Sequence, residues 1–229
     1  MPSGPHLLLG LLPGLIWLWH FRRQDAWEPE PRSAVARVFV LGCASAVLIL
    51  HLRPRAETLL PLEPGLRLEL ADAFLVTALF EESAKLVALY AAVRWDREWD
   101  EPMDGLIYGA AAGLGFASFE NAVYLSFTSD PALLLGRAAT STLAHACFSA
   151  CAGFLAGLAK LRGGRAAVPL FLAGLALATL LHGSYDALLL ARPGLDLAAL
   201  LLVLPASLVL TSLALRWSRA RSPLYHPRA

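Results

Sequence analysis

The sequence has 229 residues, of which 57% are hydrophobic and only 16% are charged, whereas soluble domains carry about 25% charged residues. With a mean hydropathy of +0.58 the chain cannot cover its apolar surface with polar groups, which excludes an ordinary soluble domain and indicates a protein of the lipid bilayer. The net charge of +1 gives no reason to expect a nucleic-acid partner.

Seven apolar runs approach the length of about 20 residues that crosses a bilayer. They predict an all-α fold, a polytopic membrane helix bundle of about seven transmembrane helices in a single membrane-embedded domain, 1–229. The first run is short and contains Pro13 and Gly14, and arginines follow it, which is the reverse of the charge order of a signal peptide. The runs are 6–21, 33–52, 70–93, 104–126, 138–159, 167–190 and 195–215.

The basic residues between these runs predict the orientation, because Lys and Arg concentrate in cytoplasmic loops. With the N-terminus outside, the inside segments hold thirteen basic residues and the outside segments five, and Lys85 lies within a run. We therefore expect an N-out, C-in bundle with a short basic cytoplasmic tail at 216–229. An eighth span at about 54–66 is disfavoured by the prolines and charges there.

Ionisable residues inside the apolar runs are the main functional signal. A charge at the centre of a spanning helix costs about 2.5–3.5 kcal/mol, whereas each Leu or Val contributes only about 0.3–0.6 kcal/mol to insertion. Such residues are expected to be paired, protonated, hydrated or bound, and they indicate a functional site by default. They are Glu81, Glu82, Lys85, Glu120, His145, His182 and Asp186.

Helix periodicity predicts which of these side chains can meet. Lys85 follows Glu81 by four residues and Glu82 by three, so all three share one helix face. A purely structural ion pair is the simpler alternative for this group.

Stripes of small residues at four-residue spacing run into the other ionisable groups and predict close helix packing. Counted from the predicted outer ends of the runs, four polar groups lie at depths of roughly 9–17 Å, which predicts one polar layer in the outer half of the membrane. These four groups are Glu81, Glu120, His145 and His182. The stripes are Gly105–Gly109–Gly113, Ser149–Gly153–Gly157 after His145, and Gly174–Ala178 before His182.

Two histidines and a carboxylate in one layer leave two kinds of hydrolytic site open. They can bind a catalytic zinc that keeps one position for water, with a further glutamate as general base. Without a metal, a glutamate in an apolar site can activate water directly while the histidines stabilise the oxyanion. The nearby Cys147 and Cys151 point away from His145 around the helix and are interpreted as packing residues.

Four motifs in chain order resemble those of the PrsW family of intramembrane proteases, over about 70–190. This stretch is the predicted catalytic core of four helices. The PrsW family is similar in turn to the CAAX-type prenyl-protein proteases and the bacteriocin-processing proteins, and their clan includes the scaffold subunit of gamma-secretase. The motifs are Glu81-Glu82-x-x-Lys85, Phe119-Glu120-x-x-x-Tyr124 behind Asp104-Gly105 and Tyr108-Gly109, His145, and His182-x-x-x-Asp186.

The resemblance implies a multi-pass peptidase of a bacterial-type plasma membrane, which cuts a single-span membrane protein near the outer face, typically an anti-sigma factor. Carried over residue by residue, it implies that Glu81 activates water and that Glu82 and Lys85 support it. It also implies zinc ligands or oxyanion-stabilising groups at Glu120, His145 and His182, and a role for Asp186 in orienting His182. A metal-dependent mechanism and a glutamic mechanism both fit these residues.

Two functions of other classes are compatible with the same residues. A proton-coupled transporter could use the carboxylates as a relay, although the sequence contains no clear inverted repeat. A non-catalytic membrane scaffold could use the polar layer to bind partner helices.

Overall fold

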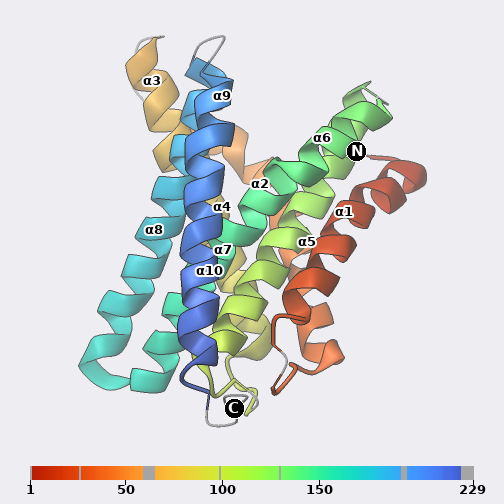
Figure 1. Ribbon diagram of the computed structural model, residues 1–229. Coiled ribbons are helices and arrows are strands. Elements are labelled where there is room, and N and C mark those ends of the chain that lie inside the picture. The colour runs from red at the N-terminus through yellow and green to blue at the C-terminus, as the bar shows by residue number, and fades with distance from the viewer. Residues whose placement is uncertain are drawn as a thin grey trace.

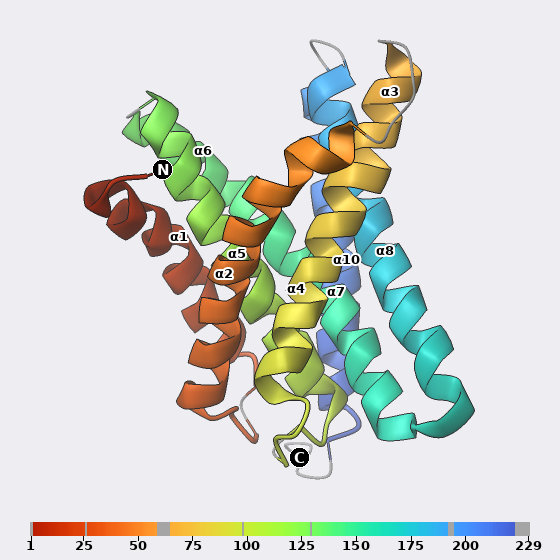
Figure 2. The ribbon, with the colours of Figure 1, turned by 180° about the vertical axis from the view of Figure 1, so that it is seen from behind.

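The computed structural model describes residues 2–25, 27–58, 65–97, 99–128, 130–191 and 195–222. Within these ranges every regular element is a helix, which confirms the all-α prediction. The helices stand side by side, with the start of α1, α3, α6 and α9 at one end of the bundle and the end of α10 at the other (Figure 1, and from behind in Figure 2).

Seven long helical segments make up the described part of the bundle, and they correspond one to one with the seven apolar runs. Three of them are composite, because a short helix or a π-helical stretch continues into the main helix. The segments are α1 (Gly4–Arg22), α2 (Arg32–Glu57), α3–η1–α4 (Leu66–Ala71, Asp72–Ala78, Leu79–Val93), α5 (Pro102–Thr128), α6–α7 (Pro131–Ala139, Ser141–Arg162), α8 (Gly164–Ala191) and α9–η2–α10 (Asp196–Ala198, Ala199–Val203, Leu204–Arg219).

Four described helices are long and apolar enough to cross a membrane by length and composition alone: 32–57, 132–162, 164–189 and 196–219. The other three segments are α1, α3–η1–α4 and α5. The last two hold four of the predicted site residues, Glu81, Glu82, Lys85 and Glu120. Residues 59–64 and 223–229, which belong to the predicted long loop and the predicted basic tail, lie outside the described residues.

The fifth apolar run differs from its prediction at the N-terminal end. A separate helix, α6, precedes α7, and the direction changes at Thr140, whose φ of −116° and ψ of −86° are not helical. The side chain of Asp130 accepts a hydrogen bond from the backbone N–H of Ala132 at 2.9 Å and so caps α6. This extra helix carries Arg137 to the site described below.

α5 lies at the centre of the bundle and packs most extensively against α7. The predicted glycine stripe is the reason for the close approach: a Cβ added to Gly109 would lie 2.1 Å from the backbone oxygen of Ser149. Glycine therefore lets the two backbones come into contact, as predicted for stripes of small residues.

The π-helical stretch η1 lies one turn before Glu81 and packs against α8. A Cβ on Gly183 would lie 2.4 Å from Cδ1 of Phe74, so only glycine allows this approach. Since His182 precedes Gly183 in the chain, the same contact brings the α8 histidine to the charged face of α4. Single π-turns inside helices occur frequently at functional sites.

Candidate active site

The structure brings all seven predicted site residues into one connected network. α4 contributes Glu81, Glu82 and Lys85, and α5, α7 and α8 contribute the others. Glu120 lies eight residues before the end of α5 at Thr128, which corresponds to about 12 Å along the helix axis. The network therefore lies in the half of the bundle that includes the N-terminus (Figure 1).

Glu82 is the centre of this network and is completely buried. Its Oε1 accepts a hydrogen bond from Lys85 Nζ at 2.6 Å and lies 2.9 Å from Nδ1 of His182. Its Oε2 accepts a hydrogen bond from the hydroxyl of Ser149 at 3.0 Å. Because both oxygens are occupied, Glu82 is suited to positioning its neighbours and not to accepting a proton from water.

Lys85 determines which nitrogen of His145 carries the proton. Its Nζ lies 2.9 Å from Nδ1 of His145 and 4.3 Å from the centre of the Phe116 ring. An ammonium group only donates hydrogen bonds, so without a bound ion Nδ1 accepts and the ring proton of neutral His145 is on Nε2. That nitrogen faces Oε2 of Glu120 at 3.1 Å.

Glu120 is held from the opposite side by Arg137 of α6, whose Nη2 donates to Oε2 at 2.6 Å. The same guanidinium donates through Nε to Oδ1 of Asn121 at 2.8 Å and lies 3.9 Å from the centre of the Tyr124 ring. The fork of an arginine can make these contacts at once, whereas a lysine cannot. Glu120 is therefore a charge-paired carboxylate between α5, α6 and α7.

His182 lies between carboxylates on both sides of its ring. Nδ1 faces Glu82, and Nε2 lies 3.3 Å from Oδ2 of Asp186 and 3.8 Å from Oε2 of Glu81. Phe148 stacks on the ring, with the ring centres 5.5 Å apart. The contact with Asp186, one helical turn away, is the one expected from the four-residue spacing.

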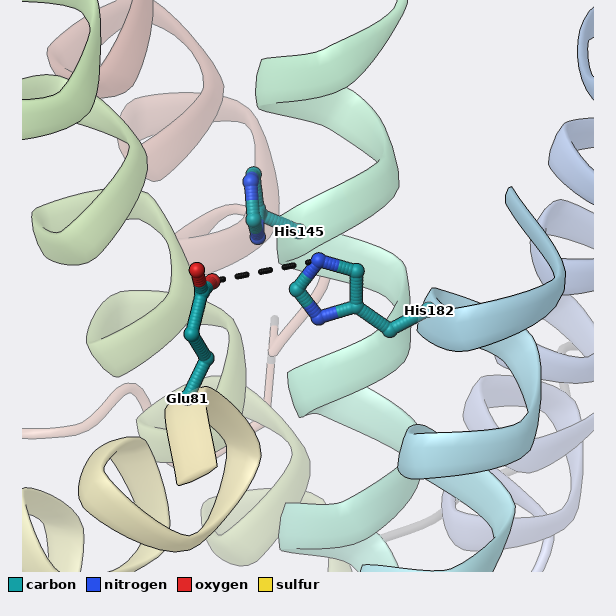
Figure 3. Close-up of side chains that lie close together, drawn as sticks. All are labelled: Glu81, His145 and His182. Atoms are coloured by element: carbon teal, nitrogen blue, oxygen red, sulfur yellow. Dashed lines mark ion pairs between the residues drawn. The ribbon is translucent and has the colours of Figure 1, made fainter. Parts of the chain in front are cut away.

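Glu81 differs from the other carboxylates because its Oε2 is buried and has no hydrogen-bond partner. This oxygen lies 3.6 Å from Nζ of Lys85, too far for a hydrogen bond but close enough for an electrostatic attraction. Glu81, His145 and His182 point toward one another from three helices (Figure 3). One potential ligand atom from each of them lies within 4.8 Å of the other two.

This trio has the donor set of a metal site, with two imidazole nitrogens and one carboxylate oxygen. Catalytic zinc is commonly held by such a set, with a further position left for water. An orphaned, buried carboxylate oxygen is also the feature that a bound cation would satisfy. The residues present therefore fit a metal ion.

A largely apolar cavity of about 270 Å³ leads to the site between α2, α4 and α5. Its polar wall groups are two carboxylates of the network, Glu81 and Glu120, together with Arg53 and Tyr124. The cavity is lined by Ala46, Ile49, Leu50, Arg53, Glu81, Phe116, Phe119, Glu120, Val123, Tyr124 and Phe127.

The geometry adds to the residues singled out from the sequence. The resemblance implies Glu120 as a metal ligand, whereas the structure groups Glu81 with the two histidines; a ligand role for Glu120 stays a prediction. Sequence reasoning missed three contacts to the site, made by Arg137, Asn121 and Ser149. A single arginine in the otherwise apolar run 131–139 is the signal that could have identified the first of them.

Comparison with known proteins agrees with the site. Residues 30–211 match the model of a family described as PrsW family intramembrane metalloprotease. The Protease PrsW of Geobacillus kaustophilus is 37% identical over 183 residues, which cover 80% of this chain and 79% of that protein. The Protease PrsW of Bacillus subtilis is 32% identical over 182 residues, covering 80% and 81%.

The Protease PrsW of Clostridioides difficile is 32% identical over 188 residues, covering 80% of this chain and 78% of that protein. No solved structure shows a significant match. The matched range includes all seven predicted site residues, from Glu81 to Asp186. The chain is all-helical and apolar, with a buried carboxylate–histidine network. Given the family match and these relatives, it belongs to the PrsW family of intramembrane metalloproteases.

Proposed function

We propose that this protease hydrolyses a peptide bond of a single-span membrane protein, near the outer face of a bacterial-type plasma membrane, as in the regulated cleavage of an anti-sigma factor. The observation that carries the proposal is the unpartnered Oε2 of Glu81, at the inner end of an apolar cavity and beside two histidines. An apolar entrance suits a substrate segment that comes from lipid.

Topology supports cleavage near the outer face. Seven spans with the N-terminus outside put thirteen basic residues on the inner side and five on the outer side. The catalytic network then lies in the outer half of the bilayer, since Glu120 is about 12 Å from the outer end of α5.

The chemistry assigned to the site begins with a water molecule between Glu81 and the two histidines. Oε2 of Glu81 accepts a proton while the water oxygen attacks the carbonyl carbon of the substrate. The charges of Lys85 and Arg137 stabilise the negative charge that develops on the carbonyl oxygen. Glu81 then returns the proton to the leaving nitrogen as the C–N bond breaks, which yields a carboxylic acid and an amine.

Zinc is the metal proposed for this site, with Glu81, His145 and His182 as the residues that would hold it. When bound, the ion would lower the pKa of the attacking water and polarise the substrate carbonyl. Glu120 would then be the carboxylate next to the ligand set, with its Oε2 3.1 Å from Nε2 of His145.

The first test is Glu81→Gln, assayed with a membrane-anchored reporter substrate. We expect cleavage to be lost while the purified protein stays monodisperse in detergent, because an amide cannot accept the proton or carry the charge. Glu69→Gln is the matched control, since Glu69 is an exposed carboxylate on the same composite helix. Full activity of Glu81→Gln would refute the role of this residue.

Elemental analysis of the same preparations separates the two roles of Glu81. We expect about one zinc per chain in the unchanged protein, and its loss in His145→Ala and His182→Ala. If Glu81→Gln also loses zinc, Glu81 is a ligand; if it keeps zinc but not activity, Glu81 is the base. An active protein without zinc would refute the metal-dependent mechanism.

A further inference from the structure

A second cluster of ionisable groups lies at the other end of α5, outside the active site. It consists of Asp25 and Glu30, between α1 and α2, and Asp104 in the first turn of α5. All three are buried, with 6%, 3% and 3% of their surfaces exposed, and one carboxylate oxygen of each lies within 4.8 Å of the others. Asp104 precedes Glu120 by sixteen residues, or about 24 Å of helix.

Hydrogen bonds position the carboxylates of Asp104 and Glu30. Oδ2 of Asp104 accepts from the backbone N–H groups of Asp100 at 2.9 Å and Glu101 at 2.6 Å. The hydroxyl of Tyr108 donates to Oε2 of Glu30. Oδ2 of Asp25 is different, because it is buried and has no hydrogen-bond partner.

No basic side chain neutralises this cluster within the described ranges. None of the ion pairs there involves any of the three carboxylates. The nearby Arg22 donates to the backbone oxygen of Glu30 at 3.2 Å, and Lys160 donates to the backbone oxygens of Asp96 and Trp99. Arg22 and Lys160 thus bind backbone oxygens, and Arg37 pairs with Asp96 outside the cluster.

Three buried acids without a cation are electrostatically unfavourable. Burial and the neighbouring charge of Asp104 raise the pKa of Glu30 to about 9. A buried carboxylate needs a proton, a positive partner or a metal ion to offset its lost hydration. The hydrogen bonds to Glu30 and Asp104 nevertheless hold their oxygens in defined positions, as the ligands of a site would be held.

We propose that Asp25, Glu30 and Asp104 bind a divalent cation of the oxygen-preferring class, which includes Mg²⁺, Ca²⁺ and Mn²⁺. A ligand set made only of carboxylate oxygens selects these ions, whereas the imidazole-containing trio of the active site suits zinc. The orphaned oxygen of Asp25 is the position that an ion would satisfy. A bound ion would tie the 23–31 connection to the start of α5.

The proposal also gives a role to a part of the sequence motif that the active site does not use. Asp104 belongs to the Asp104-Gly105 pair and Tyr108 to the Tyr108-Gly109 pair, both about three turns or more from Glu120 on the same helix. In the structure Asp104 is a member of the cluster and Tyr108 positions Glu30.

The experiment measures Mn²⁺ binding to the full-length protein in detergent by electron paramagnetic resonance. A Glu81→Gln/His182→Ala background disables the active-site trio, so that the remaining ions report on the second cluster. We expect about one Mn²⁺ per chain in this background, displaced by Mg²⁺ or Ca²⁺. Adding Asp25→Asn and Glu30→Gln should weaken binding at least tenfold, because two of the three charged ligands are lost.

Glu28→Gln, in the same background, is the matched control, since Glu28 is exposed and lies two residues from Glu30. It should bind Mn²⁺ as the background does. Absence of saturable binding in the background, or unchanged binding in the Asp25→Asn/Glu30→Gln variant, would overturn the proposal and leave a proton shared among the carboxylates.

If the double substitution lowers the yield of protein, thermal unfolding provides a second test of ion binding. In the background protein, Mn²⁺ should raise the unfolding midpoint and a chelator should lower it, because an ion that binds only the folded state stabilises it. The Asp25→Asn/Glu30→Gln variant should show no such shift. If Mn²⁺ does not change the unfolding midpoint of the background protein, the proposal is overturned without the additional substitutions.

Discussion

Glu81 and Glu82 are neighbours in the chain, yet their surroundings suit them to different tasks. Glu82 has both oxygens occupied by Lys85, Ser149 and His182, whereas Oε2 of Glu81 has no hydrogen-bond partner. Consecutive residues of a helix point about 100° apart, so one faces the interhelical network and the other the cavity. The Glu-Glu pair thus combines a carboxylate that positions its neighbours with a carboxylate that has one oxygen without a hydrogen bond.

Arg137 gives a prediction at the scale of single residues. Arg137→Gln should lower kcat by about 10- to 100-fold with a smaller change in KM, because a charge-assisted hydrogen bond worth about 1.5–3 kcal/mol to Glu120 is lost. Arg137→Lys should restore only part of the rate, since an ammonium cannot contact both Glu120 and Asn121. Steady-state kinetics on the reporter substrate measure both values.

The control for Arg137 is Arg67→Gln, which removes an exposed positive charge in α3, at the same end of the bundle. It should leave both kinetic constants near their original values. If Arg137→Gln behaves in the same way, the arginine has no positioning role.

At the scale of elements, the α5–α7 contact determines the separation between Glu120 and His145. The two helices approach through Gly109 and the backbone of Ser149, and Gly113 continues the contact to the backbone oxygen of His145. The π-helical η1 and Gly183 play the corresponding part between α4 and α8. The positions of the site residues therefore depend on close packing at glycines, against a backbone at Gly109 and against the Phe74 ring at Gly183.

Gly109→Val tests this dependence. The new side chain would overlap the backbone oxygen of Ser149, so we expect a loss of at least about 1–3 kcal/mol of stability and a fall in activity. The unfolding midpoint in detergent and the rate of reporter cleavage measure the two effects. Gly136→Ala is the control, because a Cβ there meets no atom within 4 Å and alanine favours a helix by about 0.5–1 kcal/mol. Equal midpoints for the two variants would contradict a packing role for Gly109.

At the scale of the whole molecule, the cavity between α2, α4 and α5 connects the surface of the bundle with Glu81. Its walls are largely apolar, and its polar groups include Glu81 and Glu120 of the network. The bundle thereby keeps the site accessible while the rest of the network stays buried.

A bulky side chain in the cavity should hinder substrate binding without disturbing the metal-binding residues. Val123→Trp, in the cavity wall on α5, should lower kcat/KM for the membrane-anchored reporter by about tenfold or more while zinc content is retained. Leu172→Trp is the control, since Leu172 is 54% exposed on α8 and does not line this cavity. An equal effect of both substitutions would show that the cavity is not the substrate path.

The sequence by itself determined the helices, the polar layer and its members. Apolar runs and helix periodicity are local properties, and the high cost of charge in lipid identifies Glu120, His145 and His182 without any coordinates. All seven predicted residues accordingly meet in the structure. The motif resemblance to the PrsW family added the reaction class.

Only the tertiary structure decided how these groups are partnered. Whether Glu81 or Glu120 faces both histidines depends on the rotation of each helix about its axis and on the distances between helices, which no local pattern contains. For the same reason Arg137, and the meeting of Asp25 with Asp104 across separate segments, were not evident from the sequence. The cost of a charge in lipid and the periodicity of a helix depend on residues that are close in the chain. Which side chains become partners depends instead on the packing between helices.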